Sequence, residues 1–178
     1  TTHASLHSRA RLSGAWPTDI MIMACEDVGT YTVAVRGRCM IAHSFKGECF
    51  GPAQALHGCT YVVDAVCQGQ ELKPEANYLI DICAVEQALH QTLDQYSRSN
   101  LDNHPEFVGS NTTCERMALA VWEKVAKALP APPALDKLKI VVRESDVAHV
   151  EYERALGATT DPGLYSVSVR GRFMAART

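Results

Sequence analysis

Hydrophobic and polar residues are patterned along the chain in a way that predicts two pairs of strands separated by two helices. Strand-forming residues dominate 31–42 and 56–68, and a loop with two glycines and one proline joins these runs. Together they predict an antiparallel ribbon with a long connection. The shorter runs 138–144 and 150–153 predict the closing strands.

Between the strand pairs, apolar residues recur at helical spacing in two segments. Asp81 is a predicted N-cap for the first helix, whose apolar stripe consists of Ile82, Val85, Leu89 and Leu93. Thr112 and Glu115 fit a capping box for the second helix, whose buried face consists of Met117, Val121, Val125 and Ala128. The order β-β-α-α-β-β predicts an α+β fold, with both helices on one face of a four-stranded antiparallel sheet.

The C-terminal segment 163–177 nearly repeats 29–43, since both contain Tyr-x-Val-x-Val-Arg-Gly-Arg-x-Met. Similarity this dense indicates an internal repeat and not merely shared strand propensity. It predicts the first strand of a second unit after a linker at 157–162, and Arg177 stands where the first copy has His43. The alternative is a C-terminal strand that only extends a sheet edge.

Length and composition favour one domain of ordinary globular character. The chain has 178 residues, of which 47% are hydrophobic and 21% are charged. We expect an N-terminal extension or expression remnant at 1–22, the main domain at 23–156, and the linker with the partial repeat at 157–178. The polar N-terminal segment lacks the apolar core of a signal peptide.

Charge and cysteine usage exclude several classes of protein. The net charge is −3 and basic residues form no long run, which argues against nucleic-acid and anionic-membrane partners. No apolar run approaches the roughly 20 residues that cross a bilayer. The seven cysteines form no C-x-x-C pair, which excludes zinc ribbons and thioredoxin-like motifs. We therefore expect a reduced, cytoplasmic protein.

Candidate metal ligands lie where the first two predicted strands meet. His57 and Cys59 are two residues apart at the start of a strand, so they share one face. His43 ends the preceding strand, and pairing of the two strands would make all three side chains converge. Three such ligands can hold zinc and leave one tetrahedral position open, as catalytic sites do. The alternative is a partly exposed histidine beside a small core cysteine.

This region also resembles a known family. Ala42-His43, a cysteine in the following interval and His57-Gly58-x-x-Tyr61 resemble the signature of the 6-pyruvoyltetrahydropterin synthases and of the 6-carboxytetrahydropterin synthases of the queuosine pathway. The resemblance extends over 31–152 and implies the T-fold, or tunnelling fold, with zinc as cofactor. The family signature has a third histidine where this chain has Cys59, which changes the charge at the metal.

The resemblance also implies a substrate pocket. In the family, a glutamate that ends a strand anchors the pterin, and Glu144 occupies that position. A carboxylate can accept both N–H groups of the 2-amino-4-oxo pyrimidine edge in a fork. Thr113, Cys114 and Glu115 occupy the positions that line the pocket at a helix N-terminus. As an alternative to these roles, Glu144 is a surface carboxylate and the helix start is only a cap.

The catalytic positions are retained only in part. The resemblance makes Cys49 the candidate general base, with Glu48 as a substitute. Ser97 and Arg98 stand where the family has an Asp-His proton relay, and His104 would enter only in a shifted register. Neither serine nor arginine is a general base near neutral pH.

The resemblance implies an enzyme that eliminates triphosphate from dihydroneopterin triphosphate, a zinc-dependent carbon–oxygen lyase of tetrahydrobiopterin or queuosine biosynthesis. Two alternatives remain: a pterin-binding homologue that has lost turnover, and a structural paralogue that assembles with an active partner. The family further implies a homo-oligomer, trimer-based and most often hexameric. Unpaired edges of a small sheet favour such closure with other subunits.

Overall fold

The fold was analysed in a computed structural model, which describes residues 29–129, 135–158 and 160–171. The expected extension at 1–22, the prolines of 130–133 and Arg177 lie outside these ranges. The strands are β1 (Tyr31–His43), β2 (His57–Gly69), β3 (Ser99–Asn100), β4 (Lys137–Arg143), β5 (Ala148–Ala155) and β6 (Leu164–Val169). The helices are α1 (Ile82–Asp94) and α2 (Cys114–Ala128), with short 3₁₀ turns η1 (Glu48–Gln54), η2 (Leu101–Asn103) and η3 (Pro105–Phe107).

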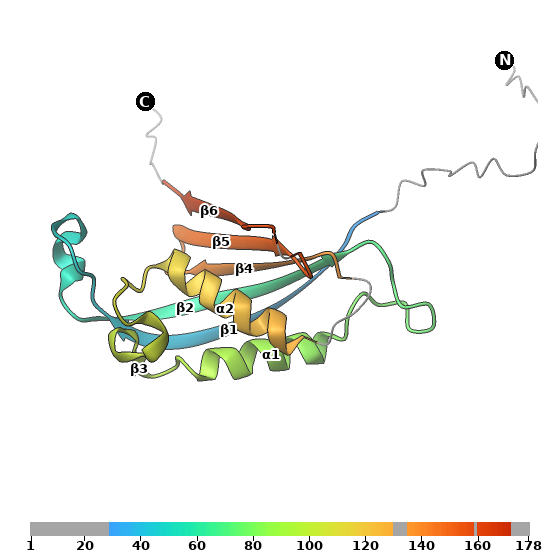
Figure 1. Cartoon of the computed structure of the whole chain (residues 1–178), viewed down its shortest axis with the longest axis horizontal. Helices are drawn as coiled ribbons and strands as arrows, with labels where there is room; N and C mark the ends of the chain where they lie inside the picture. Colours follow the sequence, from blue (N-terminus) through green and yellow to red (C-terminus); the bar gives the residue numbers. More distant parts are fainter. Residues whose placement is uncertain (1–28, 130–134, 159, 172–178) are drawn as a thin grey trace, which may run out of the picture.

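The strands of the described residues form one sheet, with the strand order β3-β1-β2-β4-β5-β6. The four long central strands pair antiparallel, and α1 and α2 lie side by side over one face, as Figure 1 shows. The α+β prediction is therefore confirmed. The prediction of four strands is wrong, because β3 and β6 extend the sheet to six.

The two additional strands have different origins. β3 has only two residues and pairs parallel with Ile41 and Ala42 of β1, where the chain returns after α1. A two-residue strand is too short to produce a periodic pattern, so β3 could not be predicted from the sequence. β6 comes from the C-terminal repeat and pairs antiparallel with the outer edge of β5.

Alternation along each strand separates the helix-covered face of the sheet from the other face. On the covered face, residues such as Cys39, Tyr61, Val63 and Ile140 are buried against the apolar stripes of the two helices. Trp122 of α2 joins this core and donates its indole N–H to the carbonyl of Leu138 at 2.8 Å. The core thus fixes which side chains of each strand face the helices.

The helix starts follow local chemistry. Asp81 caps α1 as predicted, with its carboxylate accepting the N–H of Cys83 at 2.9 Å. The predicted capping box at Thr112 is wrong by one residue: Thr113 is the N-cap of α2, and its hydroxyl accepts the N–H of Arg116 at 3.5 Å. Thr112 is buried and turned toward His43 instead. In the part of the chain that the structure describes, no helix is long and apolar enough to span a membrane.

Candidate functional site

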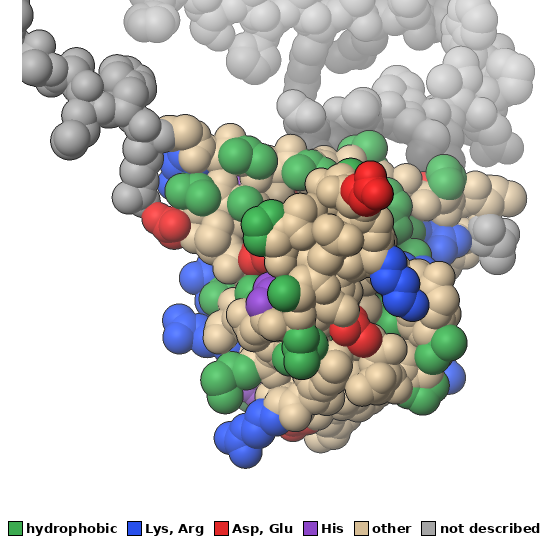
Figure 2. Space-filling model, turned by 90° about the vertical axis from the view of Figure 1, so that its left-hand side faces the viewer, with side chains coloured by type: hydrophobic (Ala, Val, Ile, Leu, Met, Phe, Trp, Pro, Cys, Tyr) green, Lys and Arg blue, Asp and Glu red, His purple; other side chains and the backbone are tan. Residues whose placement is uncertain are grey.

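Two histidines meet at one end of the sheet because of the β1–β2 register. His43 is the last residue of β1 and lies directly opposite His57, the first residue of β2. Both side chains point to the helix-covered face, and their ring centroids are 4.5 Å apart. Figure 2 views this end of the molecule and shows acidic, basic, histidine and hydrophobic side chains mixed over it.

Backbone carbonyls fix the orientation of both rings. Nδ1 of His43 lies 3.2 Å from the carbonyl oxygen of Thr112, and Nδ1 of His57 lies 2.8 Å from that of Ala55. A carbonyl can only accept, so each Nδ1 carries the proton and each Nε2 presents a lone pair. Metal-binding histidines almost always donate their other ring N–H to an acceptor such as a backbone carbonyl, which holds the ring in place.

His43 is the more constrained of the two. Its side chain is fully buried, and its Nε2 has no hydrogen-bond partner within the described ranges. Burial lowers the pKa of His43, although its hydrogen bond to Thr112 acts in the opposite direction. A buried nitrogen lone pair without a partner is costly unless something binds it. A metal ion would satisfy it.

Glu144 adds a carboxylate to the histidine pair. It follows the last residue of β4, and β4 pairs with β2 so that Arg143 lies opposite Val62. One ligand atom each from His43, His57 and Glu144 lie within 4.8 Å of one another. Two imidazoles and a carboxylate form a set that divalent transition metals accept. These three residues are therefore a candidate metal site.

Cys59, the predicted third ligand, lies next to Glu144 but is not one of the three residues of the candidate metal site. Cys59 pairs with Ile41 in the β1–β2 register, and its Sγ is 4.0 Å from the carbonyl oxygen of Glu144. Burial, and after it the charge of Glu144, raises the pKa of this thiol to about 11. In the described structure Glu144, and not Cys59, completes the group of close ligand atoms. The assignment of Cys59 as a zinc ligand stays a prediction.

The start of α2 contributes one side chain to the site. Sγ of Cys114 lies 3.5 Å from Oε2 of Glu144, and burial raises the pKa of this thiol to about 12. Thr113 is occupied as the helix cap, and Glu115 is half-buried in the first turn. Thr112, which the sequence suggested only as a cap, is the residue that orients His43. This contact joins the start of α2 to the end of β1, and a local sequence pattern cannot predict a contact between residues so far apart in the chain.

The predicted catalytic residues lie on the connection between β1 and β2. Cys49 and Glu48 are exposed on η1, and within the described ranges neither side chain makes a hydrogen bond. The connection is nevertheless held against the histidines, because Phe45 packs on His43 at 4.7 Å and on Phe50 at 4.9 Å between ring centroids. The structure thus places this loop beside the histidines without bringing the Cys49 thiol into contact with them.

The segment in which Ser97 and Arg98 replace the family's proton relay makes structural contacts. Arg98 has a left-handed backbone (φ 59°), and its N–H donates to the carbonyl of Met40 at 2.6 Å. Asp102 accepts the N–H and the hydroxyl of Ser44 at 3.1 and 2.7 Å, which ties this segment to the residue after His43. His104 packs on Tyr96 and Phe107, with ring centroids 5.1 and 5.6 Å away. None of these contacts supplies a general base to the histidine pair.

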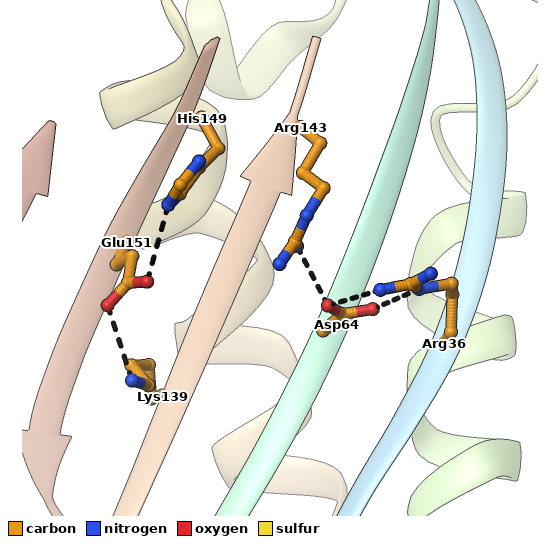
Figure 3. Close-up of polar contacts among 6 residues, drawn as sticks. All are labelled: Arg36, Asp64, Lys139, Arg143, His149 and Glu151. Carbon is orange, nitrogen blue, oxygen red and sulfur yellow. Dashed lines mark hydrogen bonds and ion pairs between the residues drawn. The ribbon is translucent and has the colours of Figure 1, made fainter. Parts of the chain in front are cut away.

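The opposite face of the sheet holds a second polar cluster, drawn in Figure 3. Asp64 accepts from Arg36 Nε at 2.6 Å and from Arg143 Nη1 at 2.8 Å. Glu151 lies 3.2 Å from Lys139 Nζ and 3.5 Å from His149 Nε2. Burial alone would raise the pKa of Asp64, but the two arginines outweigh burial and hold it below its ordinary value. Both carboxylates drawn in this cluster face basic side chains.

Comparison with solved structures identifies the architecture. A Caenorhabditis elegans 6-pyruvoyl tetrahydropterin synthase superposes with a TM-score of 0.59 at 22% identity, over 67% of this chain and 91% of that one. The Plasmodium vivax enzyme gives 0.60 at 14% identity, over 71% and 99% of the two chains. The Plasmodium falciparum protein gives 0.59 at 13% identity, over 71% and 98%. At these identities, the likeness establishes the fold.

Comparison at the sequence level identifies the family. Curated proteins provide no match to this chain. The family model described as 6-pyruvoyl tetrahydropterin synthase matches residues 32–155, which span β1 to β5 and include His43, His57 and Glu144. The chain therefore belongs to the 6-pyruvoyl tetrahydropterin synthase family and has its T-fold.

Proposed function

We propose that this protein binds a pterin, or a related 2-amino-4-oxo ring, beside a zinc ion at the histidine end of the sheet. The observation that carries the proposal is the Glu144 carboxylate, held beside two histidines that both present Nε2. Because the chain belongs to a family of pterin enzymes, this combination supports a binding mode in which Glu144 recognises the pterin ring and the metal lies near the side chain of the pterin.

The physical case for Glu144 as the pterin anchor is geometric. The pyrimidine edge of a pterin offers parallel N–H donors, and a carboxylate accepts two of them in a charge-assisted fork. Glu144 is exposed, so a ligand can reach it, and Cys114 lies against its Oε2. Thr113 and Glu115 would line the rest of the pocket.

His43 and His57 would hold the zinc, which would supply Lewis-acid activation of the hydroxyls on the pterin side chain. The third ligand is either Cys59, which the sequence predicts and which leaves Glu144 free for the pterin, or Glu144 itself. The ligand atom of Glu144 lies within 4.8 Å of those of both histidines, but as a metal ligand it would no longer anchor the pterin. Cobalt substitution separates these two assignments, because a thiolate ligand adds a charge-transfer band in the near ultraviolet and a carboxylate does not. Loss of this band in Cys59→Ser, with metal retained, would identify the sulfur ligand.

Turnover is proposed to be slow or undetectable. Ser97 and Arg98 replace the relay, and loss of acid–base assistance costs on the order of a hundred- to ten-thousand-fold in rate. Cys49 or Glu48 would have to take the proton. A Plasmodium vivax relative has been solved as a catalytic-residue mutant in which a glutamate is replaced by alanine, which makes Glu48 a reasonable substitute for Cys49.

Assembly and location complete the proposal. We infer a trimer-based homo-oligomer, with a hexamer as the expected form, because the outer edge of β1 is largely unpaired among the described residues and the family fold closes into rings. We also infer a cytoplasmic location, since all six cysteines in the described part of the chain are free.

Calorimetry with neopterin tests the pterin proposal. Glu144→Ala should weaken binding by about 1.5–3 kcal/mol, as for a hydrogen bond to a charged group. Glu151→Ala is the matched control, because that carboxylate lies on the opposite face of the sheet. If the wild-type protein binds neither neopterin nor any other pterin, the structural-paralogue alternative replaces the proposal. If dihydroneopterin triphosphate is turned over at rates usual for enzymes, our assignment of the lost relay is wrong.

A further inference from the structure

The outer edge of β5 is occupied by a strand that copies β1. β6 pairs antiparallel with β5 in the register Val150↔Val167 and Tyr152↔Tyr165. In the internal repeat, Val167 corresponds to Val33 and Tyr165 to Tyr31. The edge of β5 thus accepts a strand with the side-chain pattern of β1, in a register that the structure specifies residue by residue.

The direction of the strands makes β1 of a second copy an equivalent occupant. β1, β2, β4 and β5 alternate in direction, so β1 and β5 run opposite to each other. A second copy, rotated about an axis roughly along the strands, keeps the direction of its own β1. That strand would therefore lie antiparallel to β5, as β6 does.

With β6 in place, the same closure is disfavoured. β6 runs in the direction of β1, so β1 of a rotated copy would meet it parallel, through slanted and slightly weaker hydrogen bonds. The outer edge of β1 is meanwhile largely open, since β3 pairs only with Ile41 and Ala42 among the described residues. The β1 edge of the sheet can therefore pair with another copy, whereas the β5 edge, which would receive it, is already paired with β6 of the same chain.

β6 is also held weakly in comparison with the central strands. Its apolar residues remain exposed on the helix side, with Val167 at 63% and Val169 at 79%. Among its side-chain contacts, Tyr165 packs against Tyr152 with ring centroids 4.6 Å apart and the rings tilted by 46°. A strand that buries little apolar surface can be exchanged at modest cost.

We propose that β6 is an internal substitute for β1 of a neighbouring copy, and that it controls assembly by occupying the β5 edge. When β6 leaves, β1 of a second copy takes its place in the same register, with Val33 of that copy opposite Val150. This proposal rests on the sheet topology and the repeat, and it stands or falls independently of pterin binding.

Releasing β6 in the chain of 178 residues provides the first test. The double variant Ser166→Pro/Val167→Pro places one proline at a position whose N–H faces β5, because neighbouring residues alternate in that respect. It should assemble at protein concentrations about tenfold lower than the wild type, measured by light scattering after gel filtration. Ser166→Thr/Val167→Ile, which keeps strand propensity, is the matched control and should behave as the wild type. Unchanged assembly of the proline variant, with a native circular dichroism spectrum, would overturn the proposal.

Disulfide trapping tests the register and remains informative if the proline variant misfolds. Cysteines at Val33 and Val150 can bridge only between copies, since β2 and β4 separate β1 from β5 within one chain. The assembled protein should yield this bridge, identified by peptide mass spectrometry. Ala34→Cys with Val150→Cys is the control, because Ala34 points to the other face. An equal yield from both pairs, or an assembled protein in which Val150→Cys/Val167→Cys still bridges within the chain, would contradict the exchange.

Discussion

β1, β2 and the end of β4 bring polar residues to both faces of the sheet, and the two resulting clusters differ in whether their polar groups have partners within the protein. On the uncovered face, Asp64 is matched by Arg36 and Arg143. On the helix-covered face, ligand atoms of His43, His57 and Glu144 lie within 4.8 Å of one another, and His43 Nε2 has no partner within the described ranges. Arg143 and Glu144 are adjacent in sequence yet serve opposite clusters.

The comparison shows how a structural polar cluster can be distinguished from a site. Buried and half-buried polar groups normally find partners within the protein. The Asp64 cluster meets that rule and needs nothing further. In the histidine cluster, the Nε2 lone pair of His43 has no partner within the described ranges and lies close to His57 and the Glu144 carboxylate. A bound cation would satisfy all three groups.

The largest expected effect comes from removing a histidine of the site. His57→Ala should lower zinc affinity by more than about 100-fold, because even the loss of a group that only hydrogen-bonds to a metal ligand costs roughly 10–100-fold in affinity. The fold should change little, since an open three-ligand site is not its main source of stability. Metal content by mass spectrometry and a competition titration would measure the loss. His149→Ala, on the other face, is the control; equal zinc affinity in both variants would remove the distinction between the clusters.

Replacing Asp64 should have an intermediate effect, and only on the stability of the fold. Asp64→Asn should destabilise the fold by about 1.5–3 kcal/mol at neutral pH, the usual range for hydrogen bonds to charged groups. Zinc and pterin binding should be unchanged. Urea denaturation at neutral pH would give the difference in the free energy of unfolding.

The pH dependence of that difference has a definite sign. The pKa of Asp64 is lowered in the folded state, so its contribution is complete above the ordinary value of 3.8 and is lost as the pH falls through the lowered value. The stability difference between wild type and Asp64→Asn should therefore shrink below about pH 4. A difference that stays constant into strong acid would show that the arginines do not act on the Asp64 charge.

The smallest expected effect is at Thr112. Thr112→Val removes the hydroxyl that lies 3.2 Å from His43 Nδ1, but the backbone carbonyl at the same distance still accepts the ring proton. Zinc affinity should fall by less than about tenfold, which is less than the roughly 10–100-fold loss usual when a metal ligand loses its hydrogen-bond partner. Thermal unfolding of the metal-free protein would control for lost stability. A loss as large as that in His57→Ala would mean that the hydroxyl, and not the carbonyl, orients His43.

Local patterns determined most of the secondary structure, for a physical reason. Helical and strand periodicities depend on neighbours a few residues apart, so α1, α2 and the four long strands could be predicted from spacing alone. The same two-residue period placed His57 and Cys59 on one face. The resemblance on His43 and the His57-Gly58 pair pointed to the family before any fold was known.

Tertiary structure decided what the site contains. Glu144 was expected as a pterin anchor, but its approach to both histidines depends on the pairing of β4 with β2. Thr112 contacts His43 across 69 residues of sequence, and Asp64 contacts Arg143 across 79. The repeat was visible in the sequence, yet its place on the edge of β5 was not. Such contacts depend on register and packing between distant strands, and these are settled only when the whole sheet forms.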